Sequence, residues 1–230
     1  MKKDKIIKQL KSIILKHCKP ERIYLYGSQA NGTAQKTSDI DIAYEDKNCK
    51  NHFLIIEEIE KIETLIKIDI KNISKADKRF YNRVKDTGKV LYSATKKLRA
   101  EDGLYNLSNA LARFVEVVDN QNMYENKGFG DIYLDLLVKR FEFTYEMAWK
   151  ALKRYLDFVG IDAKNPRAVF KEAYAQQIIN NENIWLDMIE QRNLSSHIYD
   201  EFEILEIIDK KDDFKNVFTD LKNYLTAKLH

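Results

Sequence analysis

Two periods of apolar and polar residues follow one another along the first part of the chain. Apolar side chains recur every three or four positions in residues 3–17, which predicts an amphipathic helix that ends near Pro20. Residues 22–26 and 38–43 instead alternate apolar with polar or acidic side chains, which is typical of short strands. The polar segment between these two strands contains turn-forming residues and is predicted to be a loop.

The same two patterns continue to residue 95. They predict a helix over residues 52–65, a strand over 66–71, a further helix and a last short strand over 90–92. The order helix, strand, strand, helix, strand, helix, strand describes a compact α/β unit of about 90 residues, which is within the usual size range of a domain. We therefore assign residues 1–95 to a first domain of α+β type.

Only the helical period is found in the rest of the chain. Residues 131–159 predict one long helix with a broad apolar face, ended by Gly160, and such a helix suits the spine of an antiparallel bundle. The polar residues 96–103 lack a core pattern and are predicted to be a linker, so that 104–230 form an all-α second domain. The other predicted helices cover 104–121, 165–178, 181–198 and 201–227.

The net charge of +3 hides a difference between the two halves. Residues 1–97 hold 22 Lys and Arg against 13 Asp and Glu, and the remainder holds 17 against 23, so the formal charges are +9 and −6. A basic first half suits a polyanionic substrate such as a nucleotide, whereas an acidic second half is not the usual surface of a domain that grips RNA by its phosphates. The alternative is that both halves are ordinary solvated surfaces that dock on each other.

No apolar run approaches the roughly 20 residues that span a bilayer, and no signal-type cleavage site follows the lysine-rich start. We therefore expect a cytoplasmic protein without a membrane partner. Cys18 and Cys49 lack the spacing of a disulfide framework, which predicts reduced thiols. The fragments His17-Cys18 and Cys49-x-x-His52 offer zinc-ligating side chains, but two such fragments on separate elements are weak evidence for a zinc site.

Closely spaced aspartates are the main sign of chemistry in the first domain. Residues two apart in a strand point to the same face, so Asp39 and Asp41 are expected to place two carboxylates side by side. Such a pair repels unless a hard divalent cation such as Mg²⁺ binds it. Asp69, flanked by isoleucines on a later strand, can supply a third carboxylate that ligates the metal or accepts the proton of a nucleophile.

A turn that precedes the aspartates supports this interpretation. Gly27 permits a tight turn after the first strand, and Ser28 can offer hydroxyl and backbone donors to a terminal phosphate at a following helix start. Asp-x-Asp alone would be better explained as strand-end aspartates on a solvated edge. The combination with Gly27-Ser28 and a later embedded Asp69 favours a phosphate and metal site instead.

Gly27-Ser28, ten intervening residues, Asp39-x-Asp41 and Asp69 resemble the motifs of the minimal nucleotidyltransferases of the DNA polymerase β-like superfamily. The resemblance covers about residues 1–95. It implies a small mixed sheet, two magnesium ions, and transfer of a nucleoside monophosphate from ATP or another nucleoside triphosphate. It also implies that Ser28 contacts the triphosphate, that Asp39 and Asp41 are metal ligands, and that Asp69 is the third ligand or the base.

The second domain contains a short polar motif, Gln191-Arg-Asn-Leu-Ser-Ser-His-Ile-Tyr199. On a helix Asn193 and His197 share a face, so the amide can fix the tautomer of the imidazole, while the long side chain of Arg192 must reach round. A histidine beside a guanidinium suits proton transfer at a phosphodiester. The alternative is a surface helix whose His and Tyr side chains bond to their neighbours.

The second domain resembles the HEPN superfamily, and in particular helical partners of nucleotidyltransferases. Arg192, four residues, His197 and then Ile198-Tyr199 match the Arg-x4-His-x-Tyr form of HEPN toxins that pair with minimal nucleotidyltransferase antitoxins. The resemblance implies a homodimer through the helical domain, an RNA-cleaving pair formed by Arg192 and His197, and Tyr199 as an AMP acceptor (AMPylation). The family usually encodes the halves as two polypeptides, whereas here they form one chain, which makes a releasable toxin hard to arrange.

Three functions follow from these observations. The first is adenylylation of a protein hydroxyl, with Tyr199 of the same or a neighbouring chain as the acceptor. The second is nucleotidyl transfer to a small molecule, as in aminoglycoside-modifying relatives, with the acidic helical domain holding a cationic substrate. The third is a ribonuclease or RNA-binding module with a regulatory first domain. Mutation of Asp39 should abolish the first two activities, and mutation of His197 should abolish the third.

Overall fold

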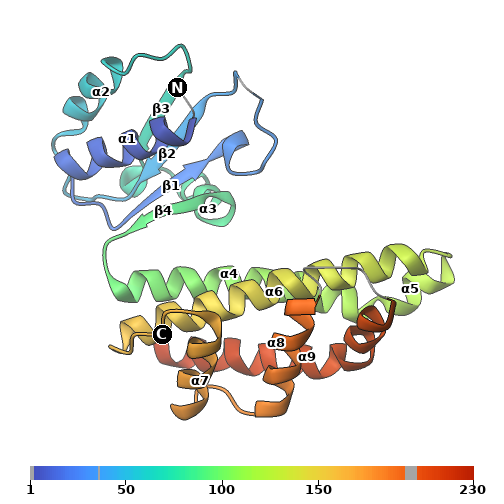
Figure 1. Ribbon diagram of the computed structural model, residues 1–230. Helices are drawn as coiled ribbons and strands as arrows, with labels where there is room; N and C mark the ends of the chain where they lie inside the picture. The colour runs from blue at the N-terminus through green and yellow to red at the C-terminus, as the bar shows by residue number, and fades with distance from the viewer. Residues whose placement is uncertain (1–2, 36, 195–200) are drawn as a thin grey trace. The chain divides into compact units, whose positions relative to one another are not determined.

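The computed structural model consists of two compact units, Met1–Leu98 and Arg99–His230. It describes residues 3–35, 37–194 and 201–230. The first unit is a small sheet with helices and the second is entirely helical in its described part (Figure 1). The predicted fold class, an α+β domain followed by an all-α domain, is therefore confirmed.

The first unit contains a four-stranded mixed sheet in the order β3-β2-β1-β4, in which β2 and β3 are parallel and the other neighbours are antiparallel. Its elements are α1 (Lys3–His17), β1 (Arg22–Tyr26), η1 (Gly27–Gln29), β2 (Ile40–Tyr44), α2 (His52–Glu60), β3 (Ile68–Asn72), η2 (Ile73–Lys75), α3 (Lys78–Thr87) and β4 (Lys89–Ser93). The predicted order of helices and strands is correct. The strand expected over 38–43 begins only at Ile40, and the helix expected over 52–65 ends at Glu60.

Alternation along the strands gives each face of this sheet a different cover. Ile23, Leu25, Ile40 and Ile42 belong to the core cluster that also contains the apolar stripe of α1 and residues of α2. The residues between them on β1, Tyr24 and Tyr26, pack with Val84 of α3 in a separate cluster. Because residues next to each other in a strand face opposite ways, Asp41 lies on the α3 face of the sheet.

Helices of the second unit enclose one apolar core. They are α4 (Lys96–Asp119), α5 (Gln121–Asn126), α6 (Gly130–Phe158), α7 (Pro166–Ala175), α8 (Glu182–Leu194) and α9 (Glu201–Leu229). The long helix α6 packs against α7 and α9, and Phe141 of α6 stacks on Phe214 of α9 with ring centroids 5.0 Å apart. The short helix α5 was not predicted.

The segment predicted as a linker, residues 96–103, is instead the start of α4. Its polar residues are mostly good helix formers, and Ala100 and Leu104, one turn apart, are buried in the core of the helical unit. Gly103 marks a close approach to α6, since a Cβ there would lie 3.1 Å from the Cα of Ala151. A glycine that suggests a break in the sequence thus serves helix packing.

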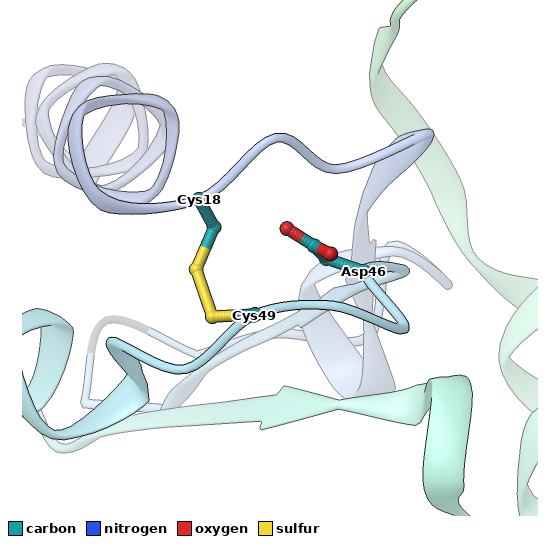
Figure 2. Close-up of side chains that lie close together, drawn as sticks. All are labelled: Cys18, Asp46 and Cys49. Atoms are coloured by element: carbon teal, nitrogen blue, oxygen red, sulfur yellow. A yellow bond between two sulfur atoms is a disulfide. The ribbon is translucent and has the colours of Figure 1, made fainter.

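The prediction of reduced thiols is wrong, because Cys18 and Cys49 form a disulfide with their Cα atoms 5.5 Å apart. Cys18 directly follows α1, and Cys49 lies in the turn-containing segment between β2 and α2 (Figure 2). The fold rather than the sequence spacing brings the two residues together. Among the described helices, none is long and apolar enough to cross a membrane.

Candidate active site

Asp41 and Asp69 lie directly opposite each other in the parallel pair of strands β2 and β3. Their neighbours Ile40, Ile42 and Ile70 are buried, as expected for residues that point to the other face. Adjacent strands are about 4.8 Å apart, so the two carboxylates are next to each other on the α3 face of the sheet. On the other side of β2, Tyr26 pairs with Asp41 in register.

Gly27 is packed so closely against Asp41 that a side chain would not fit. A Cβ at this position would lie 2.3 Å from Oδ2 of Asp41, and the backbone has φ of +69°, in the left-handed region that favours glycine. The turn continues as the short helix η1, in which the amide groups of Ala30 and Asn31 donate to the carbonyl of Gly27. The predicted turn therefore lies against the predicted aspartate.

Asp39 lies two residues before Asp41 and Ser28 directly follows Gly27, but neither lines the pocket that contains Asp41 and Asp69. Asp39 precedes β2 and is exposed, and its carbonyl accepts a hydrogen bond of 3.2 Å from Nε2 of Gln29, the residue after Ser28. The charge of Asp39 also acts on Asp41. Ser28 lies in η1, which is a single turn, so the helix start that we expected after this residue is only a short 3₁₀ segment.

Negative charge is concentrated at this site. Burial raises the pKa of Asp41 above its ordinary value, and the charges of Asp69 and Asp39 raise it further. Lys71 opposes this effect and forms an ion pair with Asp69, with Nζ 2.7 Å from Oδ2. The hydroxyl of Tyr26 donates to the same oxygen at 3.3 Å. Carboxylates that repel one another and are already neutralised in part by an ammonium fit a hard divalent cation.

A wall of the site that we did not predict comes from α3. Tyr26, Gly27, Asn31, Asp41, Asp69, Lys71, Phe80, Arg83, Val84 and Thr87 line one pocket of about 420 Å³. Lys71 could have been found from the sequence, because it lies two positions after Asp69 on the same strand face. Phe80 and Arg83 could not, since only the packing of α3 on the sheet brings them here.

Of the motif predicted in the second unit, Arg192 is described and His197 and Tyr199 lie outside the described residues. Arg192 lines a pocket of about 440 Å³ together with Tyr145, Glu146 and Trp149 of α6 and Arg167 of α7. Burial raises the pKa of Tyr145 to about 12, and the charge of Arg192 opposes this rise. Arg192 thus lies beside aromatic side chains and a second arginine.

A cluster of side chains with metal-ligating atoms, Cys18, Asp46 and Cys49, lies near the end of β2 that is farther from Asp41 (Figure 2). Asp46 stabilises the surrounding turns, because its carboxylate accepts hydrogen bonds from the amides of Lys19 at 2.8 Å and Asn48 at 2.9 Å. The histidines of the two cysteine fragments have other partners. His17 bonds to Glu58 at 2.9 Å, and the ring of His52 bonds to the hydroxyl of Tyr44 at 2.8 Å.

Comparison with known proteins agrees with this division into units. Residues 102–227 match the family described as nucleotidyltransferase substrate binding protein like. The chain belongs to this family. Residues 8–97 match the family described as polymerase beta, nucleotidyltransferase, so a nucleotidyltransferase domain and a substrate-binding domain are fused in one chain.

Proteins similar to this chain were found among curated proteins and among solved structures. A curated relative from Haemophilus influenzae, named "Probable ribonuclease HepT", is 30% identical over 82 residues, which are 34% of this chain and 56% of the relative. The chain thus spans about half the length of this relative. A solved structure from Thermus thermophilus is 25% identical with a TM-score of 0.43, covering 54% of this chain and 98% of the other.

A second solved structure, from Haemophilus influenzae, is described as revealing the fold of a substrate binding domain of a nucleotidyltransferase. It is 22% identical with a TM-score of 0.44, covering 55% of this chain and 96% of the other.

Proposed function

We propose that the chain is a Mg²⁺-dependent nucleotidyltransferase that transfers AMP from ATP to a hydroxyl acceptor. The supporting observation is the in-register pair Asp41 and Asp69, with Gly27 packed against the first of them. Asp39, Asp41 and Asp69 would hold the magnesium ions, which would supply charge neutralisation at the triphosphate. The match of residues 8–97 to the nucleotidyltransferase family supports nucleotidyl transfer as the reaction.

The residues of the chain have distinct tasks in this reaction. Gly27 leaves room for the carboxylate of Asp41, and Ser28 in the adjoining turn offers donors to the triphosphate. Asp69 acts as the third ligand or as the base that takes the proton of the acceptor hydroxyl. The acceptor oxygen then bonds to the α-phosphorus, the bond to the β-phosphate oxygen breaks, and pyrophosphate leaves.

Tyr199 is the acceptor that we propose, in the same chain or in the partner of a homodimer formed through the helical unit. This assignment comes from the Arg192-x4-His197-x-Tyr199 motif. A phenol needs only deprotonation and in-line placement against the α-phosphate. A chain that modifies itself in this way would resemble a toxin and its antitoxin in one polypeptide. A small molecule held by the substrate-binding domain is the alternative acceptor, and it predicts transfer that survives the loss of Tyr199.

A ribonuclease is the second candidate function. The curated relative named "Probable ribonuclease HepT" supports it, as does the position of Arg192 in a pocket with Trp149 and Arg167. In this case Arg192 and His197 would bind RNA and act at its phosphodiester. The acidic balance of residues 98–230, with 17 Lys and Arg against 23 Asp and Glu, weighs against tight binding of RNA.

Two activities measured on the same three proteins separate these candidates. Wild-type protein, Asp39→Ala and His197→Ala are each assayed for transfer of label from α-labelled ATP and for cleavage of RNA without added metal. We expect Asp39→Ala to abolish transfer and His197→Ala to retain it. Transfer that is unchanged in Asp39→Ala would refute the proposed function, and RNA cleavage lost only in His197→Ala would establish the second.

A further inference from the structure

The pocket beside Asp41 and Asp69 has a cationic side as well as an acidic one. The guanidinium carbon of Arg83 lies 5.0 Å from the ring centroid of Phe80, and Nζ of Lys71 lies 5.5 Å from the same centroid. The ring of Phe80 in turn packs edge-on against Tyr26, with centroids 5.7 Å apart. One aromatic side chain therefore contacts two cations that line the same pocket as Asp41 and Asp69.

These two cations differ in what they bind. Lys71 pairs with Asp69 at 2.7 Å. Arg83 is exposed and lines the pocket, and within the described part of the chain its side chain is found in a contact with Phe80 and not in an ion pair. A guanidinium that rests on an aromatic face keeps its fork of N–H donors available, and this geometry matches the oxygens of a phosphate.

We propose that Arg83 and Lys71 form a clamp for the β- and γ-phosphates of the nucleoside triphosphate. This inference rests on the proposed function. A divalent cation bound to Asp69 would displace the ammonium of Lys71 from this carboxylate. Because Lys71 lines the pocket, its ammonium would still reach a phosphate bound there. The α-phosphate would then face Asp41 and Asp69, and the two later phosphates would face α3.

The clamp also explains how the leaving group is stabilised. When the acceptor oxygen bonds to the α-phosphorus, the electron pair of the broken bond stays on pyrophosphate. The electron pair lies on the oxygen that bridged the α- and β-phosphates. Fixed cations beside this oxygen stabilise the negative charge that develops on it, without the reorganisation that water would require. Arg83 and Lys71 would therefore be phosphate-binding residues outside the motifs that define the carboxylate site.

Equilibrium binding tests the clamp without an acceptor or turnover. The probe is the Mg²⁺ complex of α,β-methylene-ATP, which cannot release pyrophosphate, and the variants are Arg83→Gln and Arg79→Gln. Arg79 is exposed on the same helix and lies outside the pocket lining, so its replacement removes the same charge from α3. Melting temperatures of all three proteins verify that each variant is folded.

We expect the affinity of Arg83→Gln for the analogue to fall about tenfold or more, since charge-assisted bonds to phosphate are lost. Arg79→Gln should bind nearly as wild-type protein does, and the affinity for AMP should be similar in all three. Equal affinity of wild-type protein and Arg83→Gln for the analogue would overturn the clamp and leave the proposed function standing. If wild-type protein binds neither the analogue nor any nucleoside triphosphate, both the clamp and the proposed function are overturned.

Discussion

Gly27 and Asp41 are in such close contact that the Cβ of any other residue at position 27 would lie 2.3 Å from a carboxylate oxygen. This contact joins the turn after β1 to the central strand β2. The pairing of β2 with β3 places Asp41 beside Asp69. The space that the carboxylate of Asp41 occupies is thus available only because residue 27 has no side chain.

Substitution of Gly27 by Ala should lower the rate of nucleotidyl transfer by more than the accompanying loss of stability explains. The methyl group must displace the carboxylate of Asp41, and misplacement of a catalytic group by about 1 Å can lower a rate roughly 100-fold. Gly32→Ala is the matched control, because Gly32 has a similar φ of +74° but nothing within 4 Å of its Cβ position. Both variants should lose about 1–2 kcal/mol of stability from backbone strain.

Kinetic and urea-denaturation measurements on both glycine variants test this expectation. Nucleotidyl transfer should fall about 100-fold in Gly27→Ala and remain near the wild-type rate in Gly32→Ala. Equal losses of transfer in the two variants would show that backbone strain, rather than contact with Asp41, explains the effect.

Asp41→Asn should be more stable than wild-type protein near neutral pH in the absence of divalent cations. Burial and the neighbouring aspartates raise the pKa of Asp41 in the folded chain, so the folded chain binds its proton more tightly than the unfolded chain does. The stability contributed by this proton is present below the ordinary carboxyl pKa of about 3.9 and is lost as pH rises through the raised value. Asparagine avoids this loss.

Melting temperatures from pH 3 to pH 8, with and without Mg²⁺, provide the measurement. The difference by which the melting temperature of Asp41→Asn exceeds that of wild-type protein should grow as the pH rises and should vanish near pH 3. Mg²⁺ should raise the melting temperature of wild-type protein and leave that of Asp41→Asn almost unchanged. A variant that is less stable than wild-type protein at every pH would contradict this account of Asp41.

Reduction of the Cys18–Cys49 disulfide should destabilise the first unit. The cross-link closes a loop with a sequence separation of 31, for which the chain-entropy relation gives about 3–4 kcal/mol. Chemical denaturation with and without a thiol reductant measures this difference. The double variant Cys18→Ser/Cys49→Ser serves as the control and should not respond to the reductant. A wild-type protein whose stability is insensitive to reductant would count against the cross-link.

The carboxylate site shows where sequence patterns suffice and where they do not. Asp41 and Asp69 could be placed on one sheet face because strand periodicity is local and their isoleucine neighbours are buried on the other face. Phe80 and Arg83 were missed because their approach depends on how α3 packs on the sheet. Gly103 was misinterpreted as part of a linker for the same reason, since only the partner helix α6 explains a glycine there.

The cysteine pair illustrates a related limit. Cys18 and Cys49 are far apart in the sequence, and no spacing rule pairs two isolated cysteines. Their approach follows from the end of α1 meeting the turn that Asp46 stabilises through the amides of Lys19 and Asn48. Such contacts depend on the assembled fold.

The most direct test of the proposed transfer is the intact mass of the purified protein after incubation with ATP and Mg²⁺. Asp41→Asn and Tyr199→Phe are treated in parallel, and each nucleoside triphosphate is tried in turn. We predict that wild-type protein gains mass in units of AMP and that neither variant does. A wild-type mass that stays unchanged with every nucleotide, or a gain that persists in Asp41→Asn, would contradict self-modification by this carboxylate site.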